Sequence, residues 1–186
     1  MKPNTTSYIT LKTSRLGNLI LVANATHLIG LYFADCEHVP VAQRDWKLDP
    51  KHPILRQARE EISEYLAGAR KTFSIPIHYA GTDFQNEIWR QIALIPFGET
   101  ITYTDLAQRA GNPNAVRAAG TATGSNRLGI IIPCHRVVGK NNALGGYAGG
   151  LDRKTHLLHL ESNPGSFPRK ASSQIPRRDR PGPTAK

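Results

Sequence analysis

A cysteine followed by a histidine and an arginine is the feature of this sequence that most directly suggests chemistry. An apolar run ends at Pro133 and leads into Cys134, His135 and Arg136. The thiolate is the reactive form of cysteine, and nearby cationic or hydrogen-bonding groups lower the pKa of a thiol below its free value of about 8.5. A nucleophilic cysteine is therefore one interpretation, and a small buried hydrophobe is the other. Because adjacent side chains of an extended segment point to opposite sides, His135 and Arg136 alone do not decide between these two interpretations.

Two short helices are predicted before this cysteine. Thr102 can cap the first, with Asp105 three residues later, and Gly111 closes it. Asn112 is expected to cap the second, with Pro113 at its first helical position. Two helices joined by so tight a turn are typical of a helix-turn-helix.

Longer elements complete the second half of the chain. Residues 82–85 form a capping box that predicts a helix ended by Pro96. Residues 128–132 form a candidate buried strand, and residues 139–142 a turn. Residues 151–160 show the spacing of a last amphipathic helix. This half is therefore predicted to be mainly helical.

The first 80 residues have the pattern of a mixed domain. Short runs rich in β-forming residues lie at 8–12, 19–23, 28–33 and 73–79. Pro53–Leu66 has apolar residues at helical spacing, with Pro53 suited to the first turn and Gly68 to the stop. The predicted fold class is α+β. A small mixed α/β N-terminal domain over residues 1–80 precedes a mainly helical C-terminal domain, residues 81–163, that contains the helix-turn-helix.

The charge of the chain is basic and uneven. Among 186 residues, 24 Lys and Arg oppose 14 Asp and Glu, for a formal net charge of +10. In residues 164–186, which are rich in Pro, Ser and Arg, six basic residues oppose Asp179 alone, and we expect this tail to be disordered. The balance suggests a polyanionic partner, nucleic acid first, with a merely solvated tail as the alternative.

Composition also bounds compartment and cofactors. No apolar run approaches the roughly 18 residues that cross a bilayer, and the start lacks a secretory signal, so we expect a cytoplasmic protein without a membrane partner. Cys36 and Cys134 are too few for a disulfide framework or a four-cysteine zinc site. Residues 35–38 contain metal-ligating types, but consecutive residues cannot all face one ion. No metal site is expected.

The cysteine run and its surroundings resemble the O6-alkylguanine-DNA alkyltransferases, also called methylated-DNA–protein-cysteine methyltransferases. The motifs that carry the resemblance are Ile-Pro-Phe-Gly-Glu at 95–99, Gly-Asn-Pro at 111–113, Arg-Ala-Ala-Gly at 117–120, Pro-Cys-His-Arg-Val at 133–137 and Leu-Gly-Gly-Tyr-Ala-Gly-Gly at 144–150. The match extends from about Phe84 to Glu161, and the first 80 residues fit only in outline. It implies repair of double-stranded DNA by irreversible, stoichiometric transfer of an alkyl group, such as methyl, from O6 of guanine to Cys134, without a cofactor.

The resemblance also implies how the cysteine is activated. The family's histidine, matched by His135, acts through a water as the base, and the match to Glu161 orients that histidine. This is the nucleophile, base and orienter arrangement of covalent catalysis. The thioether product has no easy leaving route, so each molecule is expected to act once. Without the resemblance, Glu161 would be interpreted as a plain carboxylate at a helix end.

The second helix of the pair carries few side chains that could read a base sequence. Arg117 lies among alanine, glycine and threonine, which let a helix approach any duplex closely. The resemblance implies that Arg117 enters the gap left by a flipped nucleotide, and that Tyr103 helps to rotate the nucleotide and donates to the purine. Taken alone, Tyr103 would be a half-buried aromatic at a helix start. The remaining DNA-contacting residues implied by the match are Ala118, Ala119 and Thr123.

The pocket for the alkylated base follows from the same resemblance. Besides Tyr103, its implied lining is Val137, Tyr147, Ala148 and Gly149. Asn126 matches the asparagine hinge that ties the helix-turn-helix to the cysteine loop. Ala148 departs from the pattern, because some members have a serine hydroxyl facing the guanine oxygen, and here only a backbone N–H could serve.

Other functions are weighed against this one. A non-catalytic alkyltransferase-like protein that only binds lesions would lack the reactive cysteine, so Cys134 argues against it. A helix-turn-helix regulator is disfavoured by the few base-reading side chains, and a cysteine hydrolase by the lack of any mark of an oxyanion site. A monomer is expected, and cooperative assembly along DNA stays open.

Overall fold

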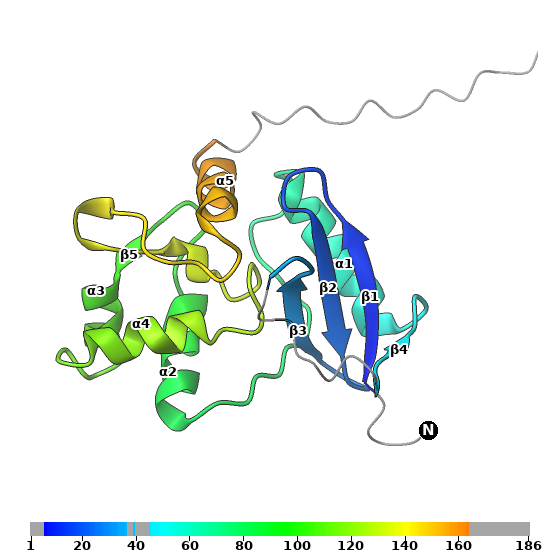
Figure 1. The fold of residues 1–186 in the computed structure, drawn as a ribbon, viewed down its shortest axis with the longest axis horizontal. Coiled ribbons are helices and arrows are strands. Elements are labelled where there is room, and N and C mark those ends of the chain that lie inside the picture. Colours follow the sequence, from blue (N-terminus) through cyan, green and yellow to red (C-terminus); the bar gives the residue numbers. More distant parts are fainter. Residues whose placement is uncertain (1–5, 37–38, 40–44, 164–186) are drawn as a thin grey trace, which may run out of the picture.

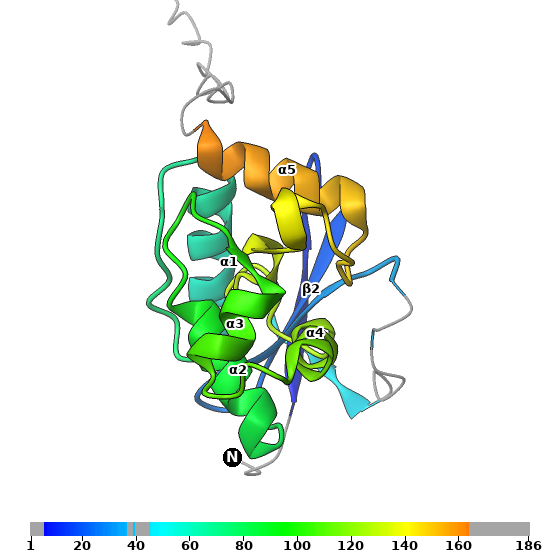
Figure 2. The same cartoon turned by 90° about the vertical axis from the view of Figure 1, so that its left-hand side faces the viewer.

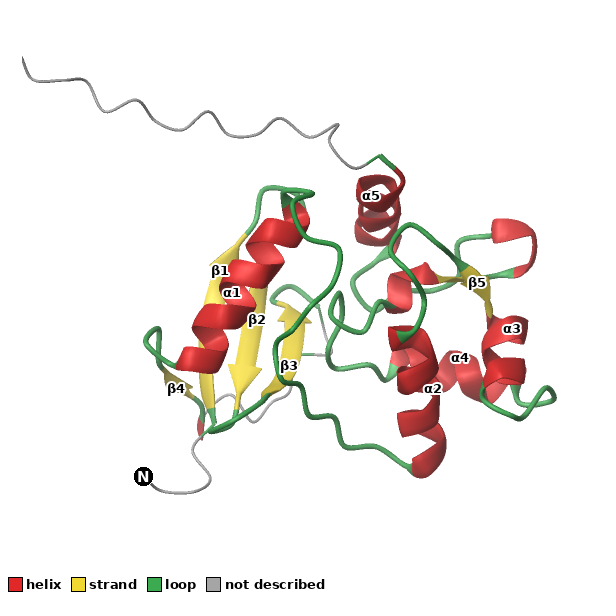
Figure 3. Cartoon of the chain, turned by 180° about the vertical axis from the view of Figure 1, so that it is seen from behind, coloured by secondary structure: helices red, strands yellow, loops and turns green. Residues whose placement is uncertain are grey.

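We describe the protein from a computed structural model that places residues 6–36, 39 and 45–163 (Figure 1). The chain begins with a sheet in the order β3-β2-β1-β4, built from β1 (Ser7–Lys12), β2 (Asn18–Ala23), β3 (Leu28–Phe33) and β4 (Lys47–Leu48). The first three strands pair antiparallel, and β4 pairs parallel with β1. Helix α1 (Pro53–Leu66) packs on one face of this sheet (Figure 3). We call the sheet with α1 the N-terminal part.

The C-terminal part is mainly helical. Its helices are α2 (Asp83–Ala93), α3 (Tyr103–Arg109), α4 (Val116–Gly124) and α5 (Leu151–Ser162). Helix α4 packs on α2 and α3. Two short strands, β5 (Ile101–Thr102) and β6 (Val137–Val138), pair in parallel and join the start of α3 to the segment after Cys134. The fold class predicted from the sequence, α+β with a helical second half, is confirmed.

Local signals explain most of these elements. Helix α1 buries Leu55, Ala58, Ile62 and Tyr65, which recur every three or four residues. Capping boxes begin α2 and α3, as predicted from Thr82 and Thr102. The apolar side chains of both parts merge in one continuous core that includes Cys134. The segment that carries Cys134 is therefore held by packing from both the N-terminal and the C-terminal part.

Two predicted strands are wrong, and one predicted helix begins later than expected. Residues 73–79 make only an isolated bridge, Ile77 to Leu28, because Pro76 lacks the N–H that a ladder needs. Residues 128–132 are buried, but only Leu128 makes an isolated bridge, to Leu31, and the residues after it turn, with Ile130 at φ 71°, a backbone that a strand excludes. Helix α4 begins at Val116 with Ala115 as its cap, since residues 112–115 form a separate turn.

Two regions of interest lie outside the described residues. They are the basic tail, 164–186, and two of the four metal-ligating types at 35–38, namely Glu37 and His38. Among the residues that are described, no helix is long and apolar enough to cross a bilayer.

Candidate active site

Cys134 begins a one-turn 3-10 helix, Cys134–Arg136, directly after Pro133. The segment is thus tightly turned and not extended, so the three side chains take separate directions. The thiol is 6% exposed. Burial raises the pKa of the Cys134 thiol, whereas a hydrogen bond from Asn126 and the charge of Lys154 lower it. The balance is a raised pKa, contrary to the depressed value suggested by the neighbours, because Arg136 is directed elsewhere. The resting group is therefore a thiol that needs a base.

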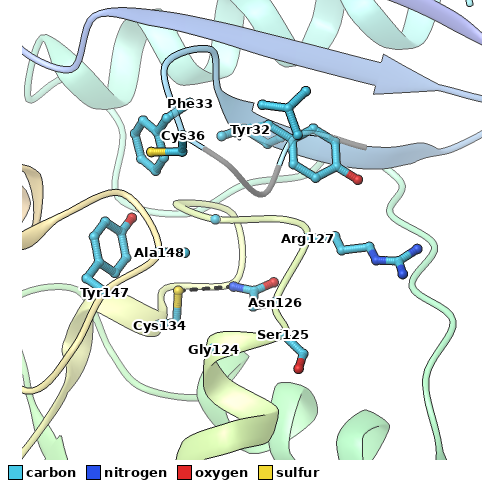
Figure 4. Close-up of a pocket in the computed structure, with 13 residues that line it drawn as sticks. Tyr32, Phe33, Cys36, Gly124, Ser125, Asn126, Arg127, Cys134, Tyr147 and Ala148 are labelled. Carbon is cyan, nitrogen blue, oxygen red and sulfur yellow. Dashed lines mark hydrogen bonds between the residues drawn. The ribbon is translucent and has the colours of Figure 1, made fainter. Parts of the chain in front are cut away.

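Asn126 ties the end of α4 to the cysteine. Its Nδ2 donates to Cys134 Sγ at 3.2 Å and to the carbonyl oxygen of Ile132 at 2.8 Å. Its Oδ1 accepts from the backbone N–H of Leu128 at 2.9 Å. Figure 4 shows the amide beside the sulfur at one wall of a cavity. One side chain thus holds both the thiol and the turn that carries it.

His135 and Glu161 form a buried pair beside the cysteine. Nε2 of His135 lies 2.9 Å from Oε1 of Glu161, and both side chains are inaccessible to solvent. Burial acts to raise the pKa of Glu161, but hydrogen bonds from His135, Arg136 and Tyr65 bring it down to about 2. An ionised carboxylate only accepts, so Nε2 carries the proton and Nδ1 of neutral His135 has a free lone pair. Nδ1 is buried and has no hydrogen-bond partner among the described residues.

Arg136 is committed to the same carboxylate. Its Nε donates to Oε2 of Glu161 at 2.9 Å and its Nη2 to Oε1 at 2.9 Å, while Nη1 donates to the carbonyl oxygen of Ile95 at 2.5 Å. The backbone N–H of Gly98 donates to Oε2 at 3.1 Å. Glu161 therefore has several fixed donors, which a buried carboxylate requires. Sequence analysis did not assign this role to Arg136.

A buried lysine is a second residue that sequence analysis missed. Lys154 is fully buried, and its Nζ donates to the carbonyl oxygens of Val137 at 2.7 Å and Gly145 at 3.1 Å. Burial lowers the pKa of Lys154, and the nearby Cys134 sulfur opposes that effect. The available signal was its spacing, because Lys154 shares the inner face of α5 with Leu157 and Glu161.

Two cavities open onto the sulfur. One has a volume of about 360 Å³ and includes Tyr103, Gly120 and Thr123 of the helical pair in its lining. The other, of about 270 Å³, reaches the end of β3 at Phe33 (Figure 4). The residues common to both linings are Gly124, Cys134, Tyr147 and Ala148. The thiol is thus mostly covered, yet a ligand has space to reach it.

The predicted DNA-contacting residues on α4 differ in how exposed they are. Arg117 and Ala118 are exposed. Ala119, in contrast, is fully buried in the core, so its side chain does not lie on the exposed surface of α4. Thr123 is 6% exposed, donates its hydroxyl to the carbonyl oxygen of Ala119 at 2.7 Å, and lines the larger cavity.

The loop after β6 forms the opposite wall. Tyr147 and Ala148 line both cavities, and the hydroxyl of Tyr147 is buried without a hydrogen-bond partner among the described residues. Burial and the Cys134 sulfur raise the pKa of Tyr147 well above its usual range, so the hydroxyl remains protonated. Gly145 allows the Tyr103 ring to approach the loop closely, since a Cβ there would lie 2.8 Å from that ring. Val137 is buried behind this wall and does not line either cavity.

Both parts of the chain match models of one protein family. Residues 83–163 match the model of the 6-O-methylguanine DNA methyltransferase DNA-binding domain, and residues 7–79 match the ribonuclease-like domain of the same proteins. The chain belongs to the 6-O-methylguanine DNA methyltransferase family.

Relatives within this methyltransferase family are similar over most of the chain. The constitutive methylated-DNA–protein-cysteine methyltransferase of Bacillus subtilis is 41% identical over 83% of this chain and 95% of its own length. The inducible protein of the same organism is 50% identical over 76% of this chain and 84% of its own length. The family resemblance stated from the motifs is therefore confirmed.

Solved methyltransferase structures agree with the fold. The Mycobacterium tuberculosis O6-methylguanine methyltransferase aligns with a TM-score of 0.80 at 35% identity, covering 87% of this chain and 95% of that one. A structure of the M. tuberculosis protein in complex with DNA aligns with a TM-score of 0.77 at 36% identity, covering 84% and 92% of the two chains. Both parts of the chain are thus represented in these structures.

Proposed function

We propose that this protein repairs DNA by transferring an alkyl group, such as methyl, from O6 of alkylated guanine to Cys134, once per molecule. The observation that supports this proposal most strongly is a buried thiol that lines a cavity beside α4. The next residue, His135, is hydrogen-bonded to an ionised Glu161. Family membership and relatives named as methyltransferases support the same reaction. The lesion-binding and regulator alternatives are not favoured, since both leave this buried set of groups unexplained.

The proposed reaction starts with a proton transfer. A water bridging Cys134 Sγ and the Nδ1 lone pair of His135 would pass the thiol proton to the imidazole, and Glu161 would stabilise the resulting imidazolium. The thiolate then attacks the alkyl carbon, an S–C bond forms and the C–O6 bond breaks. The bonding electrons pass to O6, and the guanine that leaves would take up, through water, the proton that the thiol gave to His135. The thioether remains on Cys134, so no turnover follows.

Access to the base requires that the nucleotide leave the duplex, at a cost of a few kcal/mol. We assign the DNA-facing surface to α4, where Arg117 and Ala118 are exposed. Arg117 would enter the vacated stack, where a planar cation can hydrogen-bond the orphaned base. Tyr103 and Thr123 line the larger cavity and would contact the flipped nucleotide. Buried Ala119 supports this surface from below.

The loop that carries Tyr147, Ala148 and Gly149 is the proposed wall against the purine. Ala148 offers no hydroxyl to the guanine oxygen, which leaves backbone N–H groups as donors. Val137 would act from behind this wall, as an anchor for Lys154. Asn126 is the proposed hinge between α4 and the thiol. We further propose a cytoplasmic monomer that needs no cofactor, with residues 1–80 and 81–163 as its domains.

A Cys134→Ser variant tests this function. Incubation with a duplex containing O6-methylguanine should restore guanine with the native protein and leave the lesion intact with the variant. Affinity for the lesion-containing duplex should stay within about threefold, because the substitution changes one atom in a buried wall. Repair by the serine variant, or failure of the native protein to repair, would refute the proposal.

A further inference from the structure

One side chain of the N-terminal part reaches into the His135–Glu161 pair. Tyr65, in the last turn of α1, is fully buried, and its hydroxyl donates to Oε1 of Glu161 at 2.5 Å. The same hydroxyl lies 3.4 Å from Nε2 of His135. Its ring packs against Phe73 and Phe97, at centroid distances of 5.3 and 6.1 Å. Tyr65 is thus fixed by packing and directed at the pair.

This contact joins parts of the chain that lie far apart in sequence. Tyr65 precedes His135 by 70 residues and Glu161 by 96. The other donors to Glu161 among the described residues, which are His135, Arg136 and the Gly98 backbone, belong to the C-terminal part. Figure 2 shows the C-terminal end of α5, which carries Glu161, above the end of α1. The N-terminal part therefore contributes a polar group directly to the catalytic pair.

We propose that Tyr65 is a positioning residue for alkyl transfer, whose hydroxyl fixes the Glu161 oxygen that holds Nε2 of His135 and so keeps Nδ1 available to the Cys134 thiol. This inference rests on the proposed function and deepens it. A donor on Oε1 restricts the carboxylate to one orientation, and preorganisation of this kind is what a proton acceptor near a weak nucleophile needs. The role requires the hydroxyl and not only the ring.

The hydroxyl also limits how strongly Glu161 attracts the histidine proton. The charged groups that face His135 are Glu161 and Lys154 of α5 and Arg136 of the cysteine turn. Burial is the main cause that lowers the pKa of His135. Burial and the Glu161 charge raise the pKa of Tyr65 well above its usual range, so Tyr65 remains a neutral donor. Without that donor, Oε1 would hold the Nε2 proton more tightly and the pKa of His135 would rise.

A Tyr65→Phe variant separates positioning from packing. Phenylalanine keeps the ring, and Glu161 keeps its bonds from His135 and Arg136, so the fold should persist. Tyr8→Phe is the matched control, because it removes the hydroxyl of a half-buried tyrosine of the N-terminal part that makes no hydrogen bond to another described residue. Single-turnover methyl transfer from an O6-methylguanine duplex, measured at saturating protein across pH 5.5–9, gives the rate and its pH dependence.

We expect Tyr65→Phe to slow transfer roughly tenfold, a fraction of the 10²–10⁴ that general base catalysis supplies. The pH below which the rate falls should be higher than in the native protein, because a more basic His135 becomes protonated at a higher pH. Affinity for the duplex should be unchanged, and Tyr8→Phe should match the native protein. In a Glu161→Gln background, the same substitution should change the rate less than about twofold.

Transfer by Tyr65→Phe at the native rate and with the native pH profile would overturn the inference, whether or not the Tm falls. A loss of DNA affinity alone would also overturn it. Should the variant unfold under assay conditions, the rate of Cys134 alkylation by iodoacetamide at lower temperature, followed on the Cys134 peptide, replaces the DNA assay, with the same expected shift. Failure of the native protein to repair would refute the proposed function and not this contact.

Discussion

Glu161 holds the Nε2 edge of His135 at 2.9 Å while both side chains are buried, and this contact determines which ring nitrogen can serve the cysteine. Because the carboxylate is ionised down to about pH 2, Nε2–H is the donor and Nδ1 the acceptor. The thiol of Cys134 has a raised pKa and cannot supply a resting thiolate. The base is therefore a requirement of this site.

Removal of the Glu161 charge should change both rate and stability. The folded pKa of about 2, against the ordinary 4.5, means that this group stabilises the fold above about pH 4.5 and loses that effect as pH falls towards 2. We expect Glu161→Gln to lower the free energy of unfolding at pH 7 by about 3 kcal/mol and the transfer rate by roughly 10- to 100-fold. The exposed Glu60→Gln serves as control. A Tm difference from the native protein that stayed constant between pH 7 and pH 3 would contradict the assignment.

Loss of the Asn126 amide should disorganise the thiol. Asn126→Ala removes the donor to Cys134 and leaves the backbone groups of Ile132 and Leu128 without that partner. We expect a stability loss of about 2 kcal/mol, slower transfer and a higher pKa of the thiol. Denaturant unfolding measures the loss of stability, and the rate of methyl transfer across a range of pH measures the other two effects. Ser125→Ala, one residue away and exposed, should change neither; equal effects of both variants would argue against a hinge.

Lys154 should set the pH range in which the sulfur reacts. Its charge favours the thiolate against the burial that raises the pKa of Cys134. Lys154→Met keeps much of the side-chain volume and removes the charge, so the pH midpoint of Cys134 alkylation by iodoacetamide should rise. The exposed Lys140→Met is the control. An unchanged midpoint would show that the lysine only ties the Val137 and Gly145 carbonyl oxygens.

Arg117 should matter for duplex substrates alone. We expect Arg117→Ala to slow repair of O6-methylguanine in a duplex roughly tenfold, because the flipped state loses its stacked cation. Reaction with free O6-benzylguanine needs no flipping and should proceed at the native rate. Arg56→Ala, exposed on α1, removes an equal charge away from α4. Equal slowing on both substrates would refute the role in flipping.

Local signals predicted the elements whose causes are local. The capping boxes at Thr82 and Thr102 and the apolar spacing of α1 involve neighbours within a few residues, and these elements were predicted correctly. Residues 128–132 failed because a buried run has the same composition in a strand and in a turn, and Ile130 takes a positive φ that composition does not reveal. Asn112 and Pro113 suit a turn as well as a helix start, and the structure has the turn.

The site was predictable only where motifs identified it. The motif around Cys134, with its match at Glu161, marked the residues of the pair, and the structure brings them together. Tyr65 and Lys154 were missed because their roles depend on partners that are remote in sequence, such as Glu161 for Tyr65. The burial of Ala119 could not be predicted, because its exposure depends on how α4 packs on α2 and α3.

The most direct measurement of the central claim is a titration of the protein with a duplex containing O6-methylguanine, followed by mass analysis of its peptides. The account predicts that repaired guanines saturate at one per protein molecule and that only the peptide carrying Cys134 gains a methyl group, while the Cys36 peptide stays unchanged. Repeated turnover, or a methyl group carried by Cys36 and not Cys134, would contradict it.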